Sequence, residues 1–261
     1  AGFIFLGGIG RIASVTEKLV PIMAFFYILG ALILIIMNIG NFPEALRQIF
    51  VGAFNPGAAL GGFTGVAVSS AIQYGVARGL FSNEAGMGST PHAHAVAKVD
   101  HPCDQGLVAI CSVFIDTLIV LNLTAFSVLC TGQLHEYNQS LTAAELTQAA
   151  FESAYGHFGA IFIAICMFFF AFSTIIGWYF FGEKNVRYLF KHHPAVAAKV
   201  YAAIVVVFIV VGSMLKVDLV WNLSDLFNSL MVIPNVLGLW ALSNVAKDLY
   251  DDWKKQPAKV K

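Results

Sequence analysis

The chain has 261 residues, of which 58% are hydrophobic and only 11% are charged, and its formal net charge is zero. Soluble domains carry about 25% charged residues, so this composition excludes an ordinary water-soluble protein. A lipid bilayer, in contrast, favours helices with about 20 mostly apolar residues in a row. The sequence therefore predicts an all-α membrane protein that crosses the bilayer several times.

Apolar runs along the chain predict about six membrane crossings within a single transmembrane domain that comprises residues 1–261. The predicted spans are, approximately, residues 18–38, 62–97, 105–131, 158–182, 199–215 and 219–246. The second of them is interrupted by polar residues and glycines near residues 82–90. Because the chain begins at Ala1, without a methionine and within a Gly-rich apolar stretch, we expect it to be the C-terminal part of a longer chain.

Lysine and arginine are distributed unevenly between the predicted connections. If the first span runs outward and the interrupted segment crosses the membrane, 12 of the 15 basic residues fall in segments on the inner side. Cytoplasmic loops carry an excess of lysine and arginine, so this asymmetry favours six crossings with a cytoplasmic C-terminus. We therefore expect a multi-pass protein of the plasma (inner) membrane.

Two connections on the predicted outer side are long. Residues 38–61 contain two prolines and an amphipathic turn, EALRQIF. Residues 131–157 are polar, and Ser140 is a suitable cap for a short helix that would lie on the outer surface. Long loops often act as lids, so a solvated loop and a lid over an outward-facing cavity are equally open for this connection.

Residues 78–94 read RGLFSNEAGMGSTPHAH, which is a polar and Gly-rich interruption between two apolar runs. Gly86 and Gly88 permit backbone conformations that other residues avoid, and Pro91 is suited to the start of a new helix. Irregular backbone at membrane depth is tolerated only where it is buried in protein or lines a cavity. The ends of a broken helix also carry partial charges that can hold ions and polar ligands. The interruption therefore predicts a binding site.

Charged side chains lie at the interruption and in the following span. Charges inside a membrane are costly and usually functional, so Arg78 and Glu84 strengthen the prediction of a site. The alternative is that these two residues pair with each other and only stabilise the fold. Asp116, a lone carboxylate in the next predicted span, also needs a partner. We hypothesise that Arg78 and Asp116 form a gating or packing pair.

The motif RGLFSNEAGMGSTPHAHA closely resembles the signature of the alanine/glycine:cation symporter family, whose members are also called sodium:alanine symporters. The resemblance extends to TEKLVPIMAFFYILGALI, AFNPGAALGGFTG, HPCDQGLVAICSVFIDT and AFSTIIGWYFFGEK, and so covers nearly the whole chain. It implies a partial leucine-transporter-type bundle of inverted repeats, in which this chain supplies core helices five to ten. The N-terminal repeat of the family's chain, with its own broken helix, is absent from the sequence and is expected as a partner.

The resemblance also implies a substrate site shared by the interruption and the span at residues 158–182. The residues implied to bind the substrate are Ser82, Asn83, Glu84, Gly86, Met87, Gly88, Thr174 and Trp178. Ser173 and Thr174, consecutive hydroxyls in an otherwise apolar span, resemble the residues with which this fold coordinates sodium, a hard cation that prefers oxygen ligands. Hydroxyls in spans also commonly bond to the preceding turn, and this local function remains open for both residues.

Together these features predict a symporter rather than an enzyme. It would couple Na⁺ entry to the uptake of alanine or glycine by alternating access in the lipid bilayer, with no cofactor besides the coupling ion Na⁺ and no nucleic-acid partner. A proton-coupled or differently selective amino-acid carrier is the first alternative. A membrane metal-binding protein is the second, although the spacing of its candidate ligands matches no structural zinc pattern. Those candidate ligands are His92, His94, His101, Cys103 and Asp104.

Overall fold

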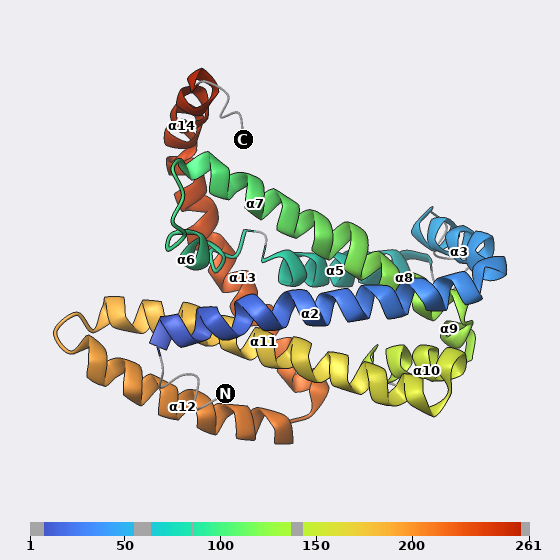
Figure 1. The fold of residues 1–261 in the computed structure, drawn as a ribbon. Helices are drawn as coiled ribbons and strands as arrows, with labels where there is room; N and C mark the ends of the chain where they lie inside the picture. Colours follow the sequence, from blue (N-terminus) through green and yellow to red (C-terminus); the bar gives the residue numbers. More distant parts are fainter. Residues whose placement is uncertain (1–7, 55–63, 85, 137–142, 257–261) are drawn as a thin grey trace. The chain divides into compact units, whose positions relative to one another are not determined.

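The computed structural model describes residues 8–54, 64–84, 86–136 and 143–256. These residues form helices joined by turns, and there is no strand among them (Figure 1). Five of the described helical segments are long and apolar enough to cross a membrane: Ser14–Met37, Pro102–Cys130, His157–Leu189, Pro194–Met214 and Val217–Ala241. The prediction of an all-α membrane protein is therefore confirmed.

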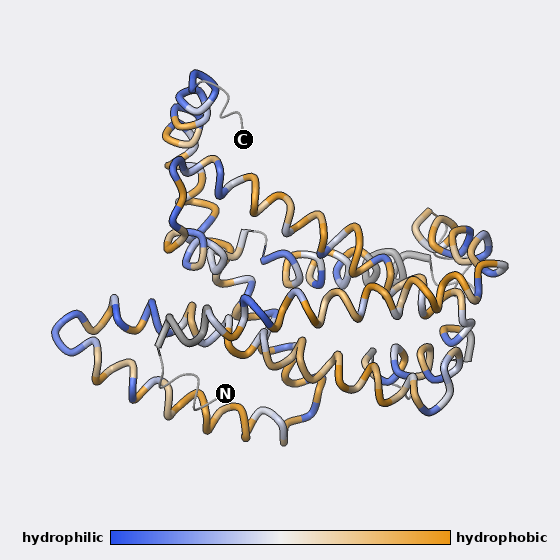
Figure 2. Tube along the Cα trace, viewed as in Figure 1, coloured by the Kyte–Doolittle hydropathy of each residue, from blue (hydrophilic) through white to orange (hydrophobic). Residues whose placement is uncertain are grey.

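Most of the described residues lie in helices that follow one another closely along the chain. The first are α2 (Gly8–Met37), α3 (Phe42–Phe54), α5 (Thr64–Asn83), α6 (Pro91–His94) and α7 (Pro102–Phe114). A π-helical segment at Ile115–Leu121 continues α7 and leads into α8 (Asn122–Cys130). The later ones are α9 (Gln133–Glu136), α10 (Ala143–Tyr155), α11 (His157–Leu189), α12 (Pro194–Met214), α13 (Val217–Ala241) and α14 (Ser243–Lys255). Figure 2 shows hydrophobic residues along most of α2 and α12, as membrane-spanning helices require.

The second predicted span, residues 62–97, corresponds to α5, an irregular segment and α6. α5 is an uninterrupted helix of 20 residues, whereas α6 is a helix of only 4 residues. The second half of the interrupted span is therefore much less helical than the sequence of residues 90–99 suggests. α5 is not among the five segments that meet the length and hydropathy requirements, so a sixth crossing stays a prediction.

The chain divides into two compact units. Unit 1 comprises residues 1–74 and 117–180, and unit 2 comprises residues 75–116 and 181–261. Unit 1 thus contains α2, α3, α8, α9, α10 and most of α11. Unit 2 contains the C-terminal end of α5, the C-terminal end of α11, and α6, α7, α12, α13 and α14.

The core of unit 1 forms where one face of α2 meets α8, α10 and α11. Tyr27, Ala31 and Leu34 recur at helical spacing, so they lie on one face of α2, and each is at most 5% exposed. Phe151 of α10 is fully buried and stacks on Tyr27. The Tyr27 hydroxyl is also hydrogen-bonded to the hydroxyl of Thr124 in α8. Close packing of aromatic and aliphatic side chains, with a few internal hydrogen bonds, therefore holds this unit together.

α10 lies within the connection at residues 131–157, for which the sequence left a solvated loop and a lid open. The proposed cap, Ser140, lies outside the described residues. Phe151 belongs to the buried core, and the Tyr155 hydroxyl donates a 2.6 Å hydrogen bond to the Gly30 carbonyl of α2. One face of this helix is therefore packed against α2 rather than free in solvent.

In unit 2, polar contacts join or anchor several helices. The Trp253 indole N–H of α14 donates to the Asp104 carboxylate of α7 at 3.1 Å. Near the end of α11, Glu183 is only 4% exposed and pairs with Arg187 at 2.7 Å. The first contact joins α14 to α7, and the second gives a buried carboxylate a partner within its own helix, because a buried polar group without a partner is costly.

Candidate functional site

The irregular segment between α5 and α6 is built on left-handed backbone. α5 ends at Asn83 and α6 begins at Pro91. Between them, Gly86 and Gly88 have φ values of 75° and 79°, which glycine adopts readily. Glu84 has a φ of 52° and is the one non-glycine residue with a positive φ in the part of the chain that the structure describes. Such a conformation costs about 1–3 kcal/mol and is found most often at functional sites.

The Glu84 carboxylate bonds to the far end of the irregular segment. Its Oε2 atom accepts hydrogen bonds from the Ser89 hydroxyl at 2.6 Å and from the Thr90 hydroxyl at 2.9 Å. Ser89 is 1% exposed, and Thr90 occupies the N-cap position of α6. The carboxylate therefore stabilises the turn, instead of pairing with Arg78 as the purely structural alternative requires.

One short hydrogen bond joins the end of α5 to the helix that follows. The Ser82 hydroxyl donates to Asp116 Oδ2 at 2.6 Å. Asp116 lies in the π-helical segment after α7, and π-helical turns occur frequently at functional sites. The neighbouring Asn83 turns its amide back toward its own helix and donates to the Gly79 carbonyl at 3.1 Å. The carboxylate in the span thus has a polar partner from the interruption.

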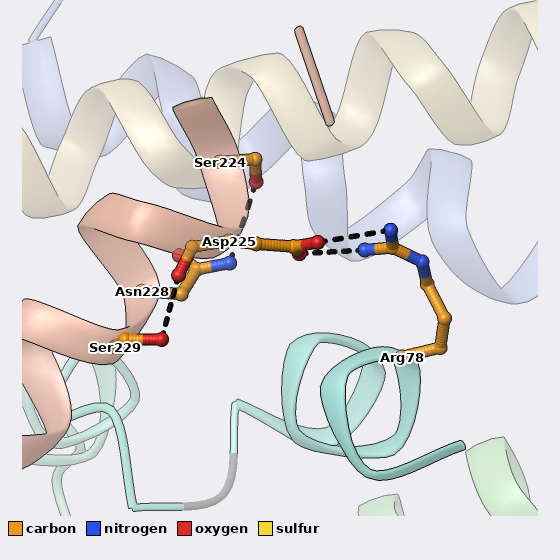
Figure 3. Close-up of polar contacts among 5 residues, drawn as sticks. All are labelled: Arg78, Ser224, Asp225, Asn228 and Ser229. Carbon is orange, nitrogen blue, oxygen red and sulfur yellow. Dashed lines mark hydrogen bonds and ion pairs between the residues drawn. The ribbon is translucent and has the colours of Figure 1, made fainter. Parts of the chain in front are cut away.

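The hypothesis that Arg78 pairs with Asp116 is wrong. Arg78 pairs instead with Asp225 of α13 (Figure 3). The two terminal guanidinium nitrogens lie 2.7 and 3.1 Å from the two carboxylate oxygens, the fork geometry that makes arginine pairs strong. The guanidinium carbon also lies 4.0 Å from the centre of the Trp221 ring. The partner of Arg78 follows from its position along α5. Arg78 lies one turn before Ser82, and at that level α13 presents the carboxylate.

A second contact from α13 reaches the irregular segment directly. Asn235 Nδ2 donates a 2.9 Å hydrogen bond to the Gly86 carbonyl. A Cβ atom built at Gly88 would lie 2.9 Å from Asn235 Oδ1, closer than real side chains approach one another. Met87, between the two glycines, is 2% exposed. The segment is therefore packed closely onto α13, with space for glycine alone at position 88.

Asp225 and Asn235 are site residues that the sequence reasoning missed. Both lie in the last predicted span, residues 219–246, where a polar side chain needs a partner. Asp225 offered the clearer signal, because it is a carboxylate within that span. Nothing in the local pattern, however, identifies partners that lie 147 and 149 positions earlier in the chain.

A cavity of about 360 Å³ lies beside the irregular segment, within unit 2. Its polar lining consists of Ser82, Asn83, Glu84, Thr90, His94, Ser112 and Asp116. The volume falls in the range of about 300–1,000 Å³ that is typical of small-molecule sites. Two carboxylates together with hydroxyl and amide groups can hold a small cation or an ammonium group by hydrogen bonds and charge.

Ser173, Thr174 and Trp178 lie on α11 in unit 1, whereas the irregular segment lies in unit 2. Both hydroxyls donate to the Phe170 carbonyl of their own helix at 2.9 Å, which is the local function that the sequence left open. A hydroxyl that donates in this way keeps its oxygen lone pairs for a cation. The joint action of these residues with the irregular segment stays a prediction.

The histidine and cysteine residues after the interruption make local contacts. His92 Nδ1 lies 2.9 Å from a backbone carbonyl, and His94 Nδ1 lies 2.7 Å from Gln105 Nε2. His101 caps α7 by accepting a 3.1 Å hydrogen bond from the Cys103 amide. Over the described ranges, no three His, Cys, Asp or Glu residues come close enough together to hold a metal ion.

Known proteins resemble this chain along its whole length. It is 41% identical over 243 residues to the sodium/alanine symporter AgcS of Methanococcus maripaludis, which covers 93% of this chain and 52% of that protein. It is 40% identical over 255 residues to the probable sodium/glutamine symporter GlnT of Bacillus subtilis, with 98% and 52% covered. It is 39% identical over 267 residues to the putative sodium/proton-dependent alanine carrier protein YrbD of Bacillus subtilis, with 98% and 54% covered.

The chain spans about half the length of the curated relatives it matches. The model of a single transporter family, described as the sodium:alanine symporter family, matches residues 1–261. The resemblance seen in the motif around the interruption is therefore confirmed, and it extends to both units. This chain belongs to the sodium:alanine symporter family.

Proposed function

We propose that the complete protein carrying this chain is a secondary active symporter that couples Na⁺ entry to the uptake of alanine or glycine. The observation that carries the proposal is the polar cavity beside a left-handed, Gly-rich break in a helix. Family membership and the names of the relatives support cation-coupled amino-acid transport as its use. The protein would work by alternating access in the plasma (inner) membrane, with six crossings from this chain and a cytoplasmic C-terminus.

The substrate would bind against the irregular backbone from Ser82 to Gly88. Backbone N–H groups in such a segment suit a carboxylate, and the carboxylates of Glu84 and Asp116 attract an ammonium group. Thr174 and Trp178 would approach the substrate from α11, as the family resemblance implies. Close walls would limit the substrate side chain to a hydrogen atom or a methyl group.

Sodium would bind at Ser173 and Thr174. Na⁺ is a hard cation and takes oxygen ligands from hydroxyls and carbonyls. Both hydroxyls donate hydrogen bonds to the Phe170 carbonyl, so their oxygens keep lone pairs for a cation. The remaining ligands would come from the N-terminal repeat, which completes the leucine-transporter-type bundle of inverted repeats in this proposal.

A proton-coupled carrier is the second candidate. The observation that favours it is the presence of three titratable side chains, Glu84, His94 and Asp116, in one cavity. The relative YrbD is also described as a putative sodium/proton-dependent alanine carrier protein. Replacement of Na⁺ by choline at constant pH separates the two candidates, because only the proton-coupled carrier retains uptake.

The proposal is tested by uptake of radiolabelled alanine into proteoliposomes that contain the complete protein. We expect wild-type uptake to require an inward Na⁺ gradient and to fall at least about tenfold, or about 1.4 kcal/mol, in Asn83→Ala and in Thr174→Ala. Two matched controls make the same local hydrogen bonds outside the site: Asn185 to the Phe181 carbonyl at 2.9 Å, and Ser213 to the Val210 carbonyl at 2.7 Å.

The controls Asn185→Ala and Ser213→Ala should transport at wild-type rates. Uptake that persists without Na⁺ would exclude sodium coupling. Equal losses in site and control variants would show that the substitutions act on folding and not on the site. Uptake of glutamine but not of alanine or glycine would leave the carrier class intact and correct the substrate.

A further inference from the structure

α13 contacts the region of the break at two levels. Asp225 pairs with Arg78 in the last turns of α5, before the helix ends. Asn235, further along α13, donates to the Gly86 carbonyl after the helix has ended. Since both contacts come from one continuous helix, α13 fixes the irregular segment relative to the helix from which it emerges.

The hydrogen bond from Asn235 acts on one particular peptide group. The Gly86 carbonyl accepts from Asn235, and the Met87 N–H on the other side of the same peptide bond donates to the Glu84 carbonyl at 3.2 Å. In a trans peptide these C=O and N–H groups point in opposite directions and rotate together as one plane. The plane is therefore held at both ends, and the peptide group between Gly86 and Met87 cannot rotate without breaking one of the two bonds.

Asn235 also occupies the space next to Gly88. The Cβ position at Gly88 lies 2.9 Å from Asn235 Oδ1 and 3.1 Å from Asn235 Cβ. The amide is therefore in close contact with the segment in addition to being hydrogen-bonded to it. Hydrogen bonding and close packing at the same residue fix both the rotation of the peptide plane and its distance from α13.

We propose that Asn235 is a positioning residue, which holds the Gly86–Gly88 backbone in the conformation that binds the transported molecule. The inference rests on the proposed function, because it assigns the affinity of that site to a residue on a different helix. Asn235 contacts the backbone of the segment and does not line the cavity beside it. Its loss should therefore weaken substrate binding while the translocation steps continue at their normal rate.

The test uses the complete protein in proteoliposomes, with initial rates of alanine uptake measured against alanine concentration at saturating Na⁺. Asn235→Ala should raise the apparent KM about 5- to 10-fold, the size expected for one hydrogen bond, and leave the maximal rate within about twofold. Asn235→Asp has the same size but places a carboxylate oxygen, an acceptor, opposite the Gly86 carbonyl, so it should raise KM at least as much.

The matched control is Asn228→Ala. Asn228 lies on the same helix, but its amide bonds to Ser224 Oγ at 3.3 Å within that helix (Figure 3). This variant should keep the wild-type KM and maximal rate. A wild-type KM in both Asn235 variants would overturn the proposal, as would equal changes in the Asn235 and Asn228 variants.

Hydrogen exchange separates a failure of this inference from a failure of the proposed function. The amide of Met87 should exchange at least about fivefold faster in Asn235→Ala than in wild type, and at the wild-type rate in Asn228→Ala. Faster exchange in a protein that does not transport alanine would uphold the positioning role and reject the proposed substrate. Unchanged exchange would reject the positioning role whatever the substrate is.

Discussion

In unit 1, aromatic and aliphatic side chains such as Tyr27 and Phe151 pack into a closed core, and the hydrogen bond between the Tyr27 and Thr124 hydroxyls joins two of its helices. In unit 2, a few polar contacts hold the break: Glu84 bonds within the segment between α5 and α6, Asn235 of α13 donates to that segment, and Asp116 accepts from Ser82 at the end of α5. A packed core is held by many individually small contacts, whereas the segment depends on a few directional bonds, each of which is costly to lose.

The difference indicates that the segment and the core of unit 1 serve different functions. A segment held by a few directional bonds can change conformation when those bonds are exchanged, which is what binding and release require. A core held by many dispersed contacts resists such changes. We therefore expect substitutions in the apolar core of unit 1 to act on stability, and substitutions at the polar contacts of the irregular segment to act on substrate affinity.

The largest expected effect is that of Phe151→Ala. Phe151 is fully buried, and truncation of a buried phenylalanine costs about 3–5 kcal/mol. The thermal unfolding midpoint in detergent should fall clearly, while the KM for alanine of the protein that remains folded should not change. Phe168→Ala is the control, because Phe168 is 63% exposed and should leave the midpoint unaltered. A raised KM in Phe151→Ala would remove the proposed division between the units.

Gly88→Ala should have the next largest effect, and it should act in the opposite way. The φ of 79° costs about 1–3 kcal/mol for a side-chain-bearing residue, and the new Cβ would meet Asn235. Alanine uptake should fall more than in Phe151→Ala, with a smaller fall of the unfolding midpoint. Gly75→Ala is the control, since a Cβ there has no neighbour within 4 Å. Normal uptake by Gly88→Ala would show that the left-handed turn is not required.

The smallest effect is expected from Glu44→Gln, which breaks an exposed ion pair in unit 1. Glu44 and Arg47 lie 2.6 Å apart on α3, and their side chains are 50% and 64% exposed. Exposed pairs of this kind contribute little, because solvent screens the charges. Neither the unfolding midpoint nor the KM should change beyond experimental error. A measurable fall in the midpoint would show that polar contacts also stabilise unit 1.

The residue types around the break were sufficient to locate it in the sequence. They were not sufficient to predict which residues pair across helices. Gly86, Gly88 and Pro91 identify the interruption because their effects on the backbone need no partner. The choice between Asp116 and Asp225 as the partner of Arg78 depends on which helix faces α5 at that level. That choice follows from the packing of whole helices, which a single sequence does not encode in any local pattern.

The same limit applies outside the site. Residues 131–157 were read as polar, and they are polar on average, but Phe151 and Tyr155 gather on one face of α10 and enter the core of unit 1. Helical periodicity predicts such a face, whereas average composition conceals it. Ser173 and Thr174 were recognised from their hydroxyls, yet their bonds to Phe170 are those of any hydroxyl in an apolar helix.

The close approach of Asn235 to Gly88 restricts the order in which this chain can evolve. A first substitution at Gly88 meets both the left-handed backbone and the amide of Asn235, so it produces an impaired carrier that selection removes. A first substitution of Asn235 by a smaller residue removes one hydrogen bond and creates no clash. Divergence at these two positions, 147 residues apart, is therefore expected to begin at 235, and a change at 88 should occur only in lineages that have already lost the asparagine.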